Sequence, residues 1–178
     1  MMVKDINTGT QSSGNSNPSD FTVVGNTLYF TAFDGNTVEL WKSDGTTAGT
    51  MMVKDINPVG QSTSLDHLTA VGNTLFFQAD DGVNGKALWK SDGTASGTVM
   101  VHDIHPGSDD TLDELTAVGN ILYFRCNDGI NGLELWKSDG TSSGTVMVKD
   151  INTQTGATIG SSIPSELTAI GNTLFFRA

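Results

Sequence analysis

The chain has a single cysteine, Cys126, in 178 residues, so no disulfide within one molecule can staple the fold. Basic residues are also scarce: 9 Lys and Arg stand against 20 Asp and Glu, which gives a net charge of −11. A surface of that sign argues against DNA, RNA or an anionic membrane as a partner. No apolar run approaches the roughly 18 residues of a membrane-spanning helix, so we expect no membrane insertion.

Motifs that would indicate catalysis are missing as well. The sequence contains no Walker loop, no CxxC pair and no recognisable Ser-His-Asp set. Glu114 and Glu166 recur, but at equivalent places in two repeats, whereas a carboxylate-based hydrolase needs two carboxylates with unlike roles. From these absences we predict that the protein is not an enzyme.

What the sequence does contain is an internal repeat. The segment Glu39–Thr46 returns almost unchanged as Ala87–Thr94 and as Glu134–Thr141, and its tryptophans (41, 89 and 136) are 48 and then 47 residues apart. A period of that size is typical of repeat proteins in which each unit is a small sheet that buries its faces against its neighbours. Two further blocks share the period. They are Met1–Ile6, Met51–Ile56, Val99–Ile104 and Val146–Ile151, and Val24–Phe30, Val71–Phe77, Val118–Phe124 and Ile170–Phe176.

These blocks predict one continuous repeat array over residues 1–178. It comprises an outer strand at 1–6, blades at 20–56, 67–104 and 115–151, and a partial blade at 166–178. Because Met1 and Met2 match Met51 and Met52 of the repeat, we expect the chain to be a segment of a longer array. A complete chain whose first methionine fits by coincidence is the alternative.

Each unit predicts four short strands, and no helical period occurs anywhere in the chain. In the second unit the strands are Leu68–Val71, Thr74–Ala79, Ala87–Lys90 and Thr98–Ile104, with a Gly-Asn hairpin turn between the first two. Long polar connectors can return the chain from the outer strand of one sheet to the inner strand of the next. The predicted fold is therefore all-β, a β-propeller of four-stranded antiparallel blades with about 3.7 repeats (178/48) of 47–50 residues. A parallel β-helix is the alternative, although its coils are typically shorter.

Most of the repeated side chains have a structural interpretation. Tryptophan is best explained as core that packs between neighbouring blades, and the Ser-Asp-Gly-Thr segment as a turn closed by its aspartate side chain. The aspartate late in each outer strand lies beside a lysine, where an ion pair or a backbone cap would account for it. Cys126 stands where other copies carry alanine, so we expect a buried thiol. The repeated positions are Trp41, Trp89 and Trp136, Asp44, Asp92 and Asp139, and Asp55, Asp103 and Asp150.

The Leu-Trp-Lys-Ser-Asp-Gly-Thr block, followed by Gly-Thr and then Val-Lys-Asp-Ile, is similar to the ELWxxDGT repeat of large bacterial surface and secreted proteins. The resemblance covers nearly the whole chain. It implies a propeller-like repeat in an extracellular or cell-surface setting, and it carries no established activity or catalytic residue. Ala87 in place of Glu and His102 in place of Lys are departures, and we expect neither to change the architecture.

The loop after the second strand of a unit is the best candidate for a ligand, since it gathers oxygen donors around glycines as a Ca²⁺ site would. The donors are Asp80, Asp81 and Asn84 in one unit and Asn127, Asp128 and Asn131 in the next. A plain Asp-Gly turn is the competing interpretation, because the alternating acidic pattern of an EF-hand is absent. No other cofactor is expected. His102 and His105 occur in one copy only, so we interpret them as substitutions and not as a repeated metal site.

The function expected from these features is a non-catalytic structural or interaction module of an extracellular or cell-surface bacterial protein. It would present loops or self-assemble through open blade edges. Its partner would be the protein itself, by ring completion or head-to-tail assembly, or an extracellular protein or glycan. The alternative is a lectin-like carbohydrate-binding or Ca²⁺-binding propeller with repeated sites between blades. Enzymatic use of the scaffold has the least support.

Overall fold

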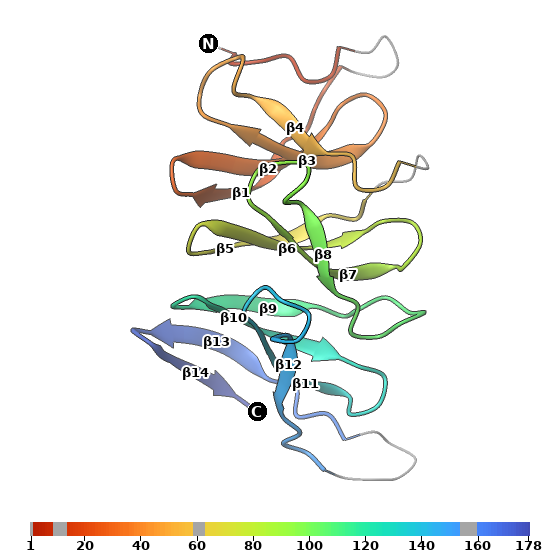
Figure 1. Cartoon of the computed structure of the whole chain (residues 1–178), viewed down its shortest axis with the longest axis vertical. Helices are drawn as coiled ribbons and strands as arrows, with labels where there is room; N and C mark the ends of the chain where they lie inside the picture. The colour runs from red at the N-terminus through yellow and green to blue at the C-terminus, as the bar shows by residue number, and fades with distance from the viewer. Residues whose placement is uncertain (1, 9–13, 59–62, 154–159) are drawn as a thin grey trace.

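The computed structural model describes residues 2–8, 14–58, 63–153 and 160–178, and all regular structure within them is β. These residues contain no helix that is long and apolar enough to cross a membrane. The strands, shown in Figure 1, are β1 (Ser19–Val24), β2 (Thr27–Phe33), β3 (Val38–Ser43), β4 (Met51–Lys54), β5 (Asp66–Val71), β6 (Thr74–Asp80), β7 (Lys86–Ser91), β8 (Val99–His102), β9 (Asp113–Val118), β10 (Ile121–Asn127), β11 (Leu133–Ser138), β12 (Val146–Lys149), β13 (Ser165–Ile170) and β14 (Thr173–Arg177).

The strands form antiparallel meanders in which sequence order equals spatial order. Three sheets have four strands each, β1–β4, β5–β8 and β9–β12, and β13 pairs with β14 in a two-stranded sheet. The first strands of successive sheets contact one another, β1 with β5, β5 with β9 and β9 with β13. The predicted order of strands within a blade is confirmed. The sheets do not close on themselves, so the structure establishes an open stack of blade-like sheets (Figure 1).

The N-terminal segment differs from its predicted form. Met2–Ile6 is assigned no strand, and Met1 lies outside the described residues. The segment still lies against the first blade, because Lys4 Nζ donates to the Thr50 carbonyl at 2.7 Å and Thr47 Oγ1 donates to the Val3 carbonyl at 2.7 Å. A strand needs a neighbour for its backbone groups, and the contacts that hold this segment are made by side chains instead.

The turn within each Trp block has the predicted geometry. Thr94 N donates to Asp92 Oδ1 at 2.8 Å, and the equivalent bonds at Asp44 and Asp139 measure 2.9 and 2.8 Å. The carboxylate also packs on the glycine of the following Gly-Thr pair: a Cβ atom on Gly97 would lie 2.1 Å from Asp92 Oδ1. This close approach explains why the repeat has glycine there in each copy.

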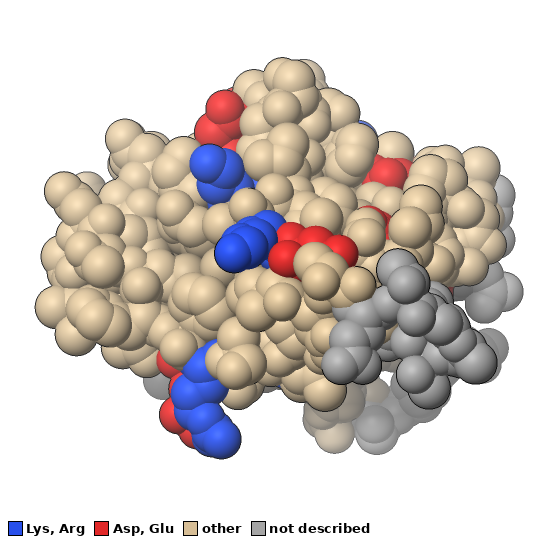
Figure 2. All heavy atoms as spheres, turned by 90° about the horizontal axis from the view of Figure 1, so that it is seen from below, with Lys and Arg blue, Asp and Glu red and all other residues tan. Residues whose placement is uncertain are grey.

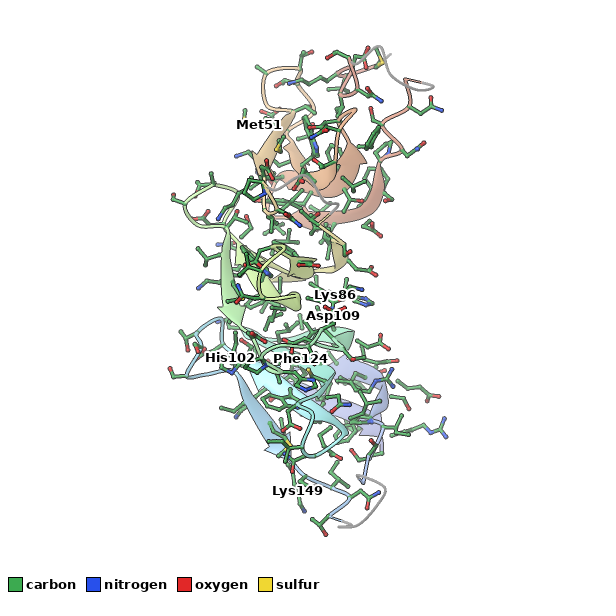
Figure 3. All side chains as sticks on the ribbon, turned by 90° about the vertical axis from the view of Figure 1, so that its right-hand side faces the viewer. Met51, Lys86, His102, Asp109, Phe124 and Lys149 are labelled. Atoms are coloured by element: carbon green, nitrogen blue, oxygen red, sulfur yellow. The ribbon has the colours of Figure 1, made fainter. Side chains whose placement is uncertain are left out.

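The core lies between sheets, as predicted for the tryptophans. Trp89 clusters with Val53 and Ile56 of the preceding outer strand and with Phe77 of its own sheet. Trp136 packs in the same way against the second blade, and the side chains of Trp41, Trp89 and Trp136 are 7%, 6% and 9% exposed. Cys126 is fully buried, as expected. Figure 3 shows Phe124 inside the stack and Lys149 near its lower end.

The two ends of the stack expose apolar side chains whose counterparts inside it are buried or partly buried. Phe21 and Val23 are exposed at the first blade, and Phe175, Phe176 and Ile170 at the last. Viewed from the end that carries β13 and β14, the surface is largely uncharged, with a few basic and acidic groups (Figure 2). Each interior sheet buries both faces, so these end faces lack the neighbour that covers the same face elsewhere in the stack.

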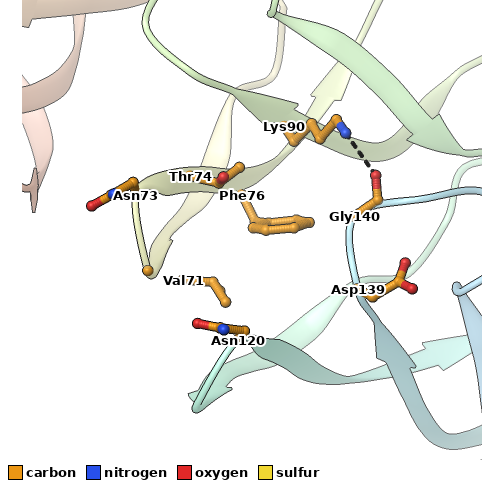
Figure 4. Close-up of a pocket in the computed structure, with 9 residues that line it drawn as sticks. Val71, Asn73, Thr74, Phe76, Lys90, Asn120, Asp139 and Gly140 are labelled. Carbon is orange, nitrogen blue, oxygen red and sulfur yellow. Dashed lines mark hydrogen bonds between the residues drawn. The ribbon is translucent and has the colours of Figure 1, made fainter.

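Lysines from one blade bind the backbone of the next. Lys42 Nζ donates to the Gly93 carbonyl at 2.7 Å, and Lys90 Nζ donates to the Gly140 carbonyl at 2.8 Å (Figure 4). Lys54 Nζ donates to the Thr98 carbonyl at 2.8 Å and lies over the Trp89 ring, 5.6 Å from its centroid. The repeated lysines are therefore clamps between blades, a role that spacing alone does not reveal.

Lys90→Met should lower the free energy of unfolding by about 1–2 kcal/mol, because it removes a charge-assisted hydrogen bond that joins two blades. Lys137→Met is the matched control. Lys137 occupies the same repeat position but is exposed, and the described residues place no further Asp-Gly turn beside it, so Lys137→Met should change stability by less than about 0.5 kcal/mol. Urea denaturation measures both, and equal losses would contradict the clamp.

Candidate functional site

Buried carboxylates behind the Trp strand form the first group with unusual chemistry. Glu39 and Glu134 are both fully buried. Glu39 Oε2 accepts a hydrogen bond from Ile56 N at 3.4 Å, and Glu134 Oε2 accepts one from Ile151 N at 3.2 Å. Each carboxylate therefore caps the backbone where the outer strand of its own blade ends.

In the third blade the glutamate also binds the connector that leads to β13. Ser162 N donates to Glu134 Oε1 at 2.9 Å, and Ser162 Oγ donates to Glu134 Oε2 at 2.5 Å. The backbone of Ser162 is fixed beside β11 by a bond from its N–H to the Leu133 carbonyl at 3.2 Å. Glu134 and Ser162 thus form a pair that joins sheet and connector.

In the second blade the acidic residue lies on the connector and not on the Trp strand. Ala87 replaces the glutamate, and Asp110 occupies the connector position, with its N–H bonded to the Lys86 carbonyl at 2.8 Å. Asp110 Oδ2 accepts from Ile104 N at 3.0 Å, and Oδ1 accepts from His105 N at 2.7 Å. The backbone group that Glu39 and Glu134 cap is therefore capped here from the connector. Sequence reasoning missed Asp110, and the exceptional Ala87 was the one signal that pointed to it.

Burial raises the pKa of two of the carboxyl groups, Glu39 and Asp110. Desolvation raises the pKa of Glu39 from 4.5 to about 7, against the opposing hydrogen bond from Ile56, with the Asp55 carboxylate adding a smaller upward shift. Desolvation also raises the pKa of Asp110 from 3.8 to about 6, and Asp103 adds to that shift. The aspartates late in the outer strands therefore lie near the buried carboxylates.

Exchanging the residue types at positions 87 and 110 tests whether Asp110 replaces the glutamate cap of the other blades. Asp110→Ser alone should destabilise the protein by about 1–3 kcal/mol, since it leaves buried N–H groups of Ile104 and His105 without an acceptor. Ala87→Glu alone should also destabilise, because two carboxylates would share one buried site.

The double variant Ala87→Glu/Asp110→Ser recreates the Glu134–Ser162 pair and should recover most of the loss, which denaturation measurements on all four proteins would detect. Additive losses in the double variant would contradict the exchange.

The raised pKa of Glu39 predicts a pH dependence of stability. Below pH 4.5 both states are protonated. As the pH rises toward 7 the unfolded state ionises first, so the free energy of unfolding falls. The contribution of Glu39 is roughly 3 kcal/mol between these limits. Denaturation from pH 4 to 8 should show a shallower fall for Glu39→Gln than for the wild type, and identical slopes would rule out a buried, proton-binding Glu39.

The loops predicted to hold Ca²⁺ are closed by their own hydrogen bonds. Asp81 Oδ1 accepts from Val83 N at 2.9 Å and from Asn84 N at 2.8 Å, and Oδ2 accepts from Asn84 Nδ2 at 2.7 Å. Asp128 makes the same three bonds with Ile130 and Asn131. Asp80 and Asn127 instead accept from the glycine two residues on, at 2.7 and 2.8 Å.

Despite partial burial, which alone would raise them, hydrogen bonds from their loop partners lower the pKa of Asp81 and of Asp128. Within the described residues no group of three or more His, Cys, Asp or Glu side chains could hold a metal ion. The Ca²⁺ site stays a prediction, and the loops have a complete structural explanation without it.

The other predicted polar positions are dispersed. Asp55, Asp103 and Asp150 take part in no ion pair in the part of the chain that the structure describes, and one carboxylate oxygen of Asp103 and of Asp150 is buried there without a hydrogen bond. His102 Nδ1 lies 2.9 Å from Ser142 Oγ of the next blade, at the place where Lys54 binds the Thr98 carbonyl. His102 therefore makes a contact between blades.

A second group of side chains lies where each first strand begins. Asp20, His67, Glu114 and Glu166 occupy one repeat position, and each has a positive φ, of 54°, 59°, 58° and 58°. The register of the first two strands shifts at the same point in every sheet, so the position is a β-bulge. Because the first strands of successive sheets contact one another, these four residues form a row, here named the strand-entry row.

Hydrogen bonds connect the row from blade to blade. Glu114 Oε2 accepts from Leu167 N of the following sheet at 3.3 Å. Thr22 Oγ1 donates to the Leu68 carbonyl at 3.0 Å, and Thr116 Oγ1 donates to the Leu167 carbonyl at 3.3 Å. The row is therefore held in place by neighbouring sheets.

The row and its cross-strand partners vary from copy to copy, whereas the Trp block is nearly constant. The residue just before each row position pairs with the second strand, and its partner there is Thr31, Gln78, Arg125 or Arg177. Arg125 forms an ion pair with Asp113 and donates to the Pro164 carbonyl at 3.1 Å. Arg177 pairs with Glu166 at 2.9 Å on the exposed surface. Polar variation on a constant framework makes the row a candidate binding surface.

A pocket of about 240 Å³ lies between the second and third blades, beside the Lys90 clamp (Figure 4). Phe76 forms an aromatic wall, and Asn73, Asn120 and Asp139 supply polar groups. At the equivalent place between the first two blades, a Cβ atom on Gly93 would lie 2.3 Å from the Tyr29 hydroxyl oxygen. Between the first two blades the Tyr29 hydroxyl therefore fills space that stays open as the pocket beside Phe76 between the second and third blades.

The chain matches no known protein family and no curated protein. Among solved structures its fold is similar to that of puromycin hydrolase, with a TM-score of 0.53 and 11% identity over 73% of this chain and 20% of that one. A structure of a variant of puromycin hydrolase complexed with PGG has a TM-score of 0.55 and 10% identity over 85% of this chain and 23% of that one. The chain thus spans about a fifth of the length of these solved structures.

This comparison contradicts the predicted assignment as a non-catalytic structural or interaction module, together with its lectin-like alternative. The assignment rested on the repeat architecture and on the absence of recognisable catalytic motifs, whereas the structures that resemble it are hydrolases with a β-propeller-like fold. At 10–11% identity the likeness concerns the fold alone. Function has to be argued from the side chains of this chain.

Proposed function

We propose that the array is a β-propeller-type domain, related to the ELWxxDGT repeats of surface and secreted proteins, that binds a positively charged ligand or substrate along the strand-entry row. The observation that carries the proposal is that the row presents Asp, His or Glu at one bulged position of successive sheets, whereas the Trp block is nearly constant.

The packing of the stack supports a radial arrangement. Each first strand contacts the first strand of the next sheet, as expected when these strands lie nearest a common axis. The row would then face the axis, where side chains from several blades converge on one ligand. The positive φ of Asp20, His67, Glu114 and Glu166 favours function as well, because strained non-glycine residues cluster at binding sites.

The charge of the row indicates the chemistry of the ligand. In the row, Asp20, Glu114 and Glu166 carry carboxylates, and Asp66 and Asp113 add two more at the position just before it. These five outnumber the two arginines, Arg125 and Arg177, and both arginines already pair with carboxylates of their own sheets. The side chains of Asp66 and Glu166 are 60% and 69% exposed, so a partner can reach Asp66 directly and can compete with Arg177 for Glu166. Ligands that carry amines or guanidinium groups match this surface.

Tetralysine is a suitable probe, titrated into the protein by calorimetry at low ionic strength. The double variant Asp66→Asn/Glu166→Gln should weaken its binding about 5–10-fold, since two carboxylates near the ligand are lost. The control Asp55→Asn/Asp109→Asn removes the same charge from exposed sites outside the row and should change binding less than about 2-fold. Equal effects of the two double variants would show that only the overall charge of −11 attracts the probe.

Hydrolysis is the second candidate function, and the likeness to puromycin hydrolase favours it. In that case the row would position an amine-bearing substrate for cleavage. Incubation of the protein with puromycin, followed by chromatography of the products, tests the idea. Cleavage above the buffer rate that falls in Asp66→Asn/Glu166→Gln would support it, and a rate equal to buffer would reject it for this chain.

A further inference from the structure

We propose that the second blade holds a further binding site, for a small zwitterion that carries a carboxylate and an amine close together. The site is a pocket of about 240 Å³ between β6, β7 and the connector that leads to β9, here named the connector pocket. This volume is below the roughly 300–1,000 Å³ of pockets for drug-sized ligands, so its ligand is small. The pocket is lined by Gln78, Lys86, Asp109, Asp110, Thr111 and Leu112.

Lys86 brings a positive charge without a partner to this pocket. The lysines that recur in the repeat, such as Lys42 and Lys90, donate to carbonyls of the next blade. Lys86 stands outside the repeated lysine positions, and its Nζ makes no hydrogen bond or ion pair among the described residues. The first and third units have Val38 and Leu133 at the same place in the strand register. Packing of the blade therefore does not require an ammonium group there.

Asp109 brings the opposite charge to the same pocket. Lys86 N donates to Asp109 Oδ1 at 3.1 Å, so the backbone of β7 holds that carboxylate beside the strand (Figure 3). A Cβ atom on Gly85 would lie 2.9 Å from the same oxygen, and glycine permits this approach. Among the described residues the side chains of Lys86 and Asp109 form no ion pair with each other. A zwitterion would bind both, with its carboxylate on Lys86 and its ammonium on Asp109.

Buried polar groups fix the wall of the pocket. Asp110 and Gln78 are 1% and 5% exposed. Asp110 N donates to the Lys86 carbonyl at 2.8 Å, and Gln78 Nε2 donates to the Asp110 carbonyl at 2.6 Å. Gln78 Oε1 has no partner in the described part of the chain, so it can accept a hydrogen bond from the ligand's ammonium. The pocket is thus preorganised, which lowers the entropy that binding costs.

The third blade uses different residues at the equivalent place. Arg125 stands in place of Gln78, and Leu133 stands in place of Lys86. Arg125 donates to the Pro164 carbonyl at 3.1 Å, so its guanidinium group lies against the connector. The third blade therefore has neither the free amide oxygen nor the lysine. The proposed site belongs to the second unit and does not depend on the strand-entry row.

L-Valine is the probe, and magnetic resonance of the isotope-labelled protein follows its binding. One molecule should bind per protein with a Kd on the order of 1 mM, and the amide signals of Lys86 and of residues 109–112 should shift. Isovalerate is the matched compound without the amine, and isobutylamine is the one without the carboxylate. Each should bind at least about 10-fold more weakly, because it loses one charged contact.

No shift with L-valine at concentrations up to about 20 mM would overturn the proposal. Equal affinity for the three compounds, or shifts confined to other parts of the protein, would overturn it as well.

Variants of the protein identify the two charged groups. Lys86→Val installs the residue that the first unit carries at this position, so the fold should persist, and binding of L-valine should fall at least about 10-fold. The control Lys137→Val removes the same charge from an exposed site on the third blade and should change binding less than about 2-fold. Asp109→Asn, an exposed substitution, should weaken binding of L-valine but not of isovalerate. Unchanged binding of L-valine by Lys86→Val or by Asp109→Asn would contradict the assigned contacts.

The connector pocket and the strand-entry row can fail separately. Lys86→Val removes a positive charge outside the row, so it should not weaken binding of tetralysine. A protein that binds tetralysine but not L-valine would refute the pocket alone, and the reverse result would refute the row alone.

Discussion

The structure depends on the tryptophan that the second and third sheets each contribute to the interface with the sheet before it. Trp89 fills the space between Phe77 of its own sheet and the outer-strand residues Val53 and Ile56 of the previous one. Such an aromatic side chain removes some 150–250 Å² of surface from water, and no sheet can bury it alone. Lysine clamps add directional bonds from Lys42 and Lys90 to glycine carbonyls of the next blade. Each blade is thus stable only through contact with others, as in repeat proteins generally.

Local chemistry explains why much of the fold could be predicted from the sequence. Strand order followed from short turns, and the Asp92 turn from the tendency of an aspartate to bind backbone two residues on. The Asp110 cap could not be predicted, because Asp110 lies on a connector, and the sequence does not reveal that the path of this connector brings its carboxylate to the Ile104 N–H group. The β-bulge at Glu114 could not be predicted either, because the sheet imposes a positive φ that glutamate by itself disfavours.

The assignment as a structural or interaction module was wrong because it took repeat architecture and missing motifs as evidence about activity. Similar folds occur in puromycin hydrolase at 10–11% identity, so blades of this kind accompany hydrolysis at least in those proteins. In the proposed function, side chains such as Asp66 and Glu166, which differ between some of the units, decide what the array binds. Sequence analysis noted that Glu114 and Glu166 recur at equivalent places. That Asp20 and His67 occupy the same position became clear only from the structure, in which the first strands of successive sheets lie side by side.

The exchange between Ala87 and Asp110 limits how such arrays can change in evolution. A unit with glutamate in its Trp strand carries its own cap and can be duplicated or shuffled with any serine-bearing connector. The second unit cannot, because its cap belongs to the connector that follows. A recombination breakpoint between residues 87 and 110 would yield a progeny array with either no buried acid or two, and selection would remove both. The true module of inheritance here is longer than the visible repeat by one connector.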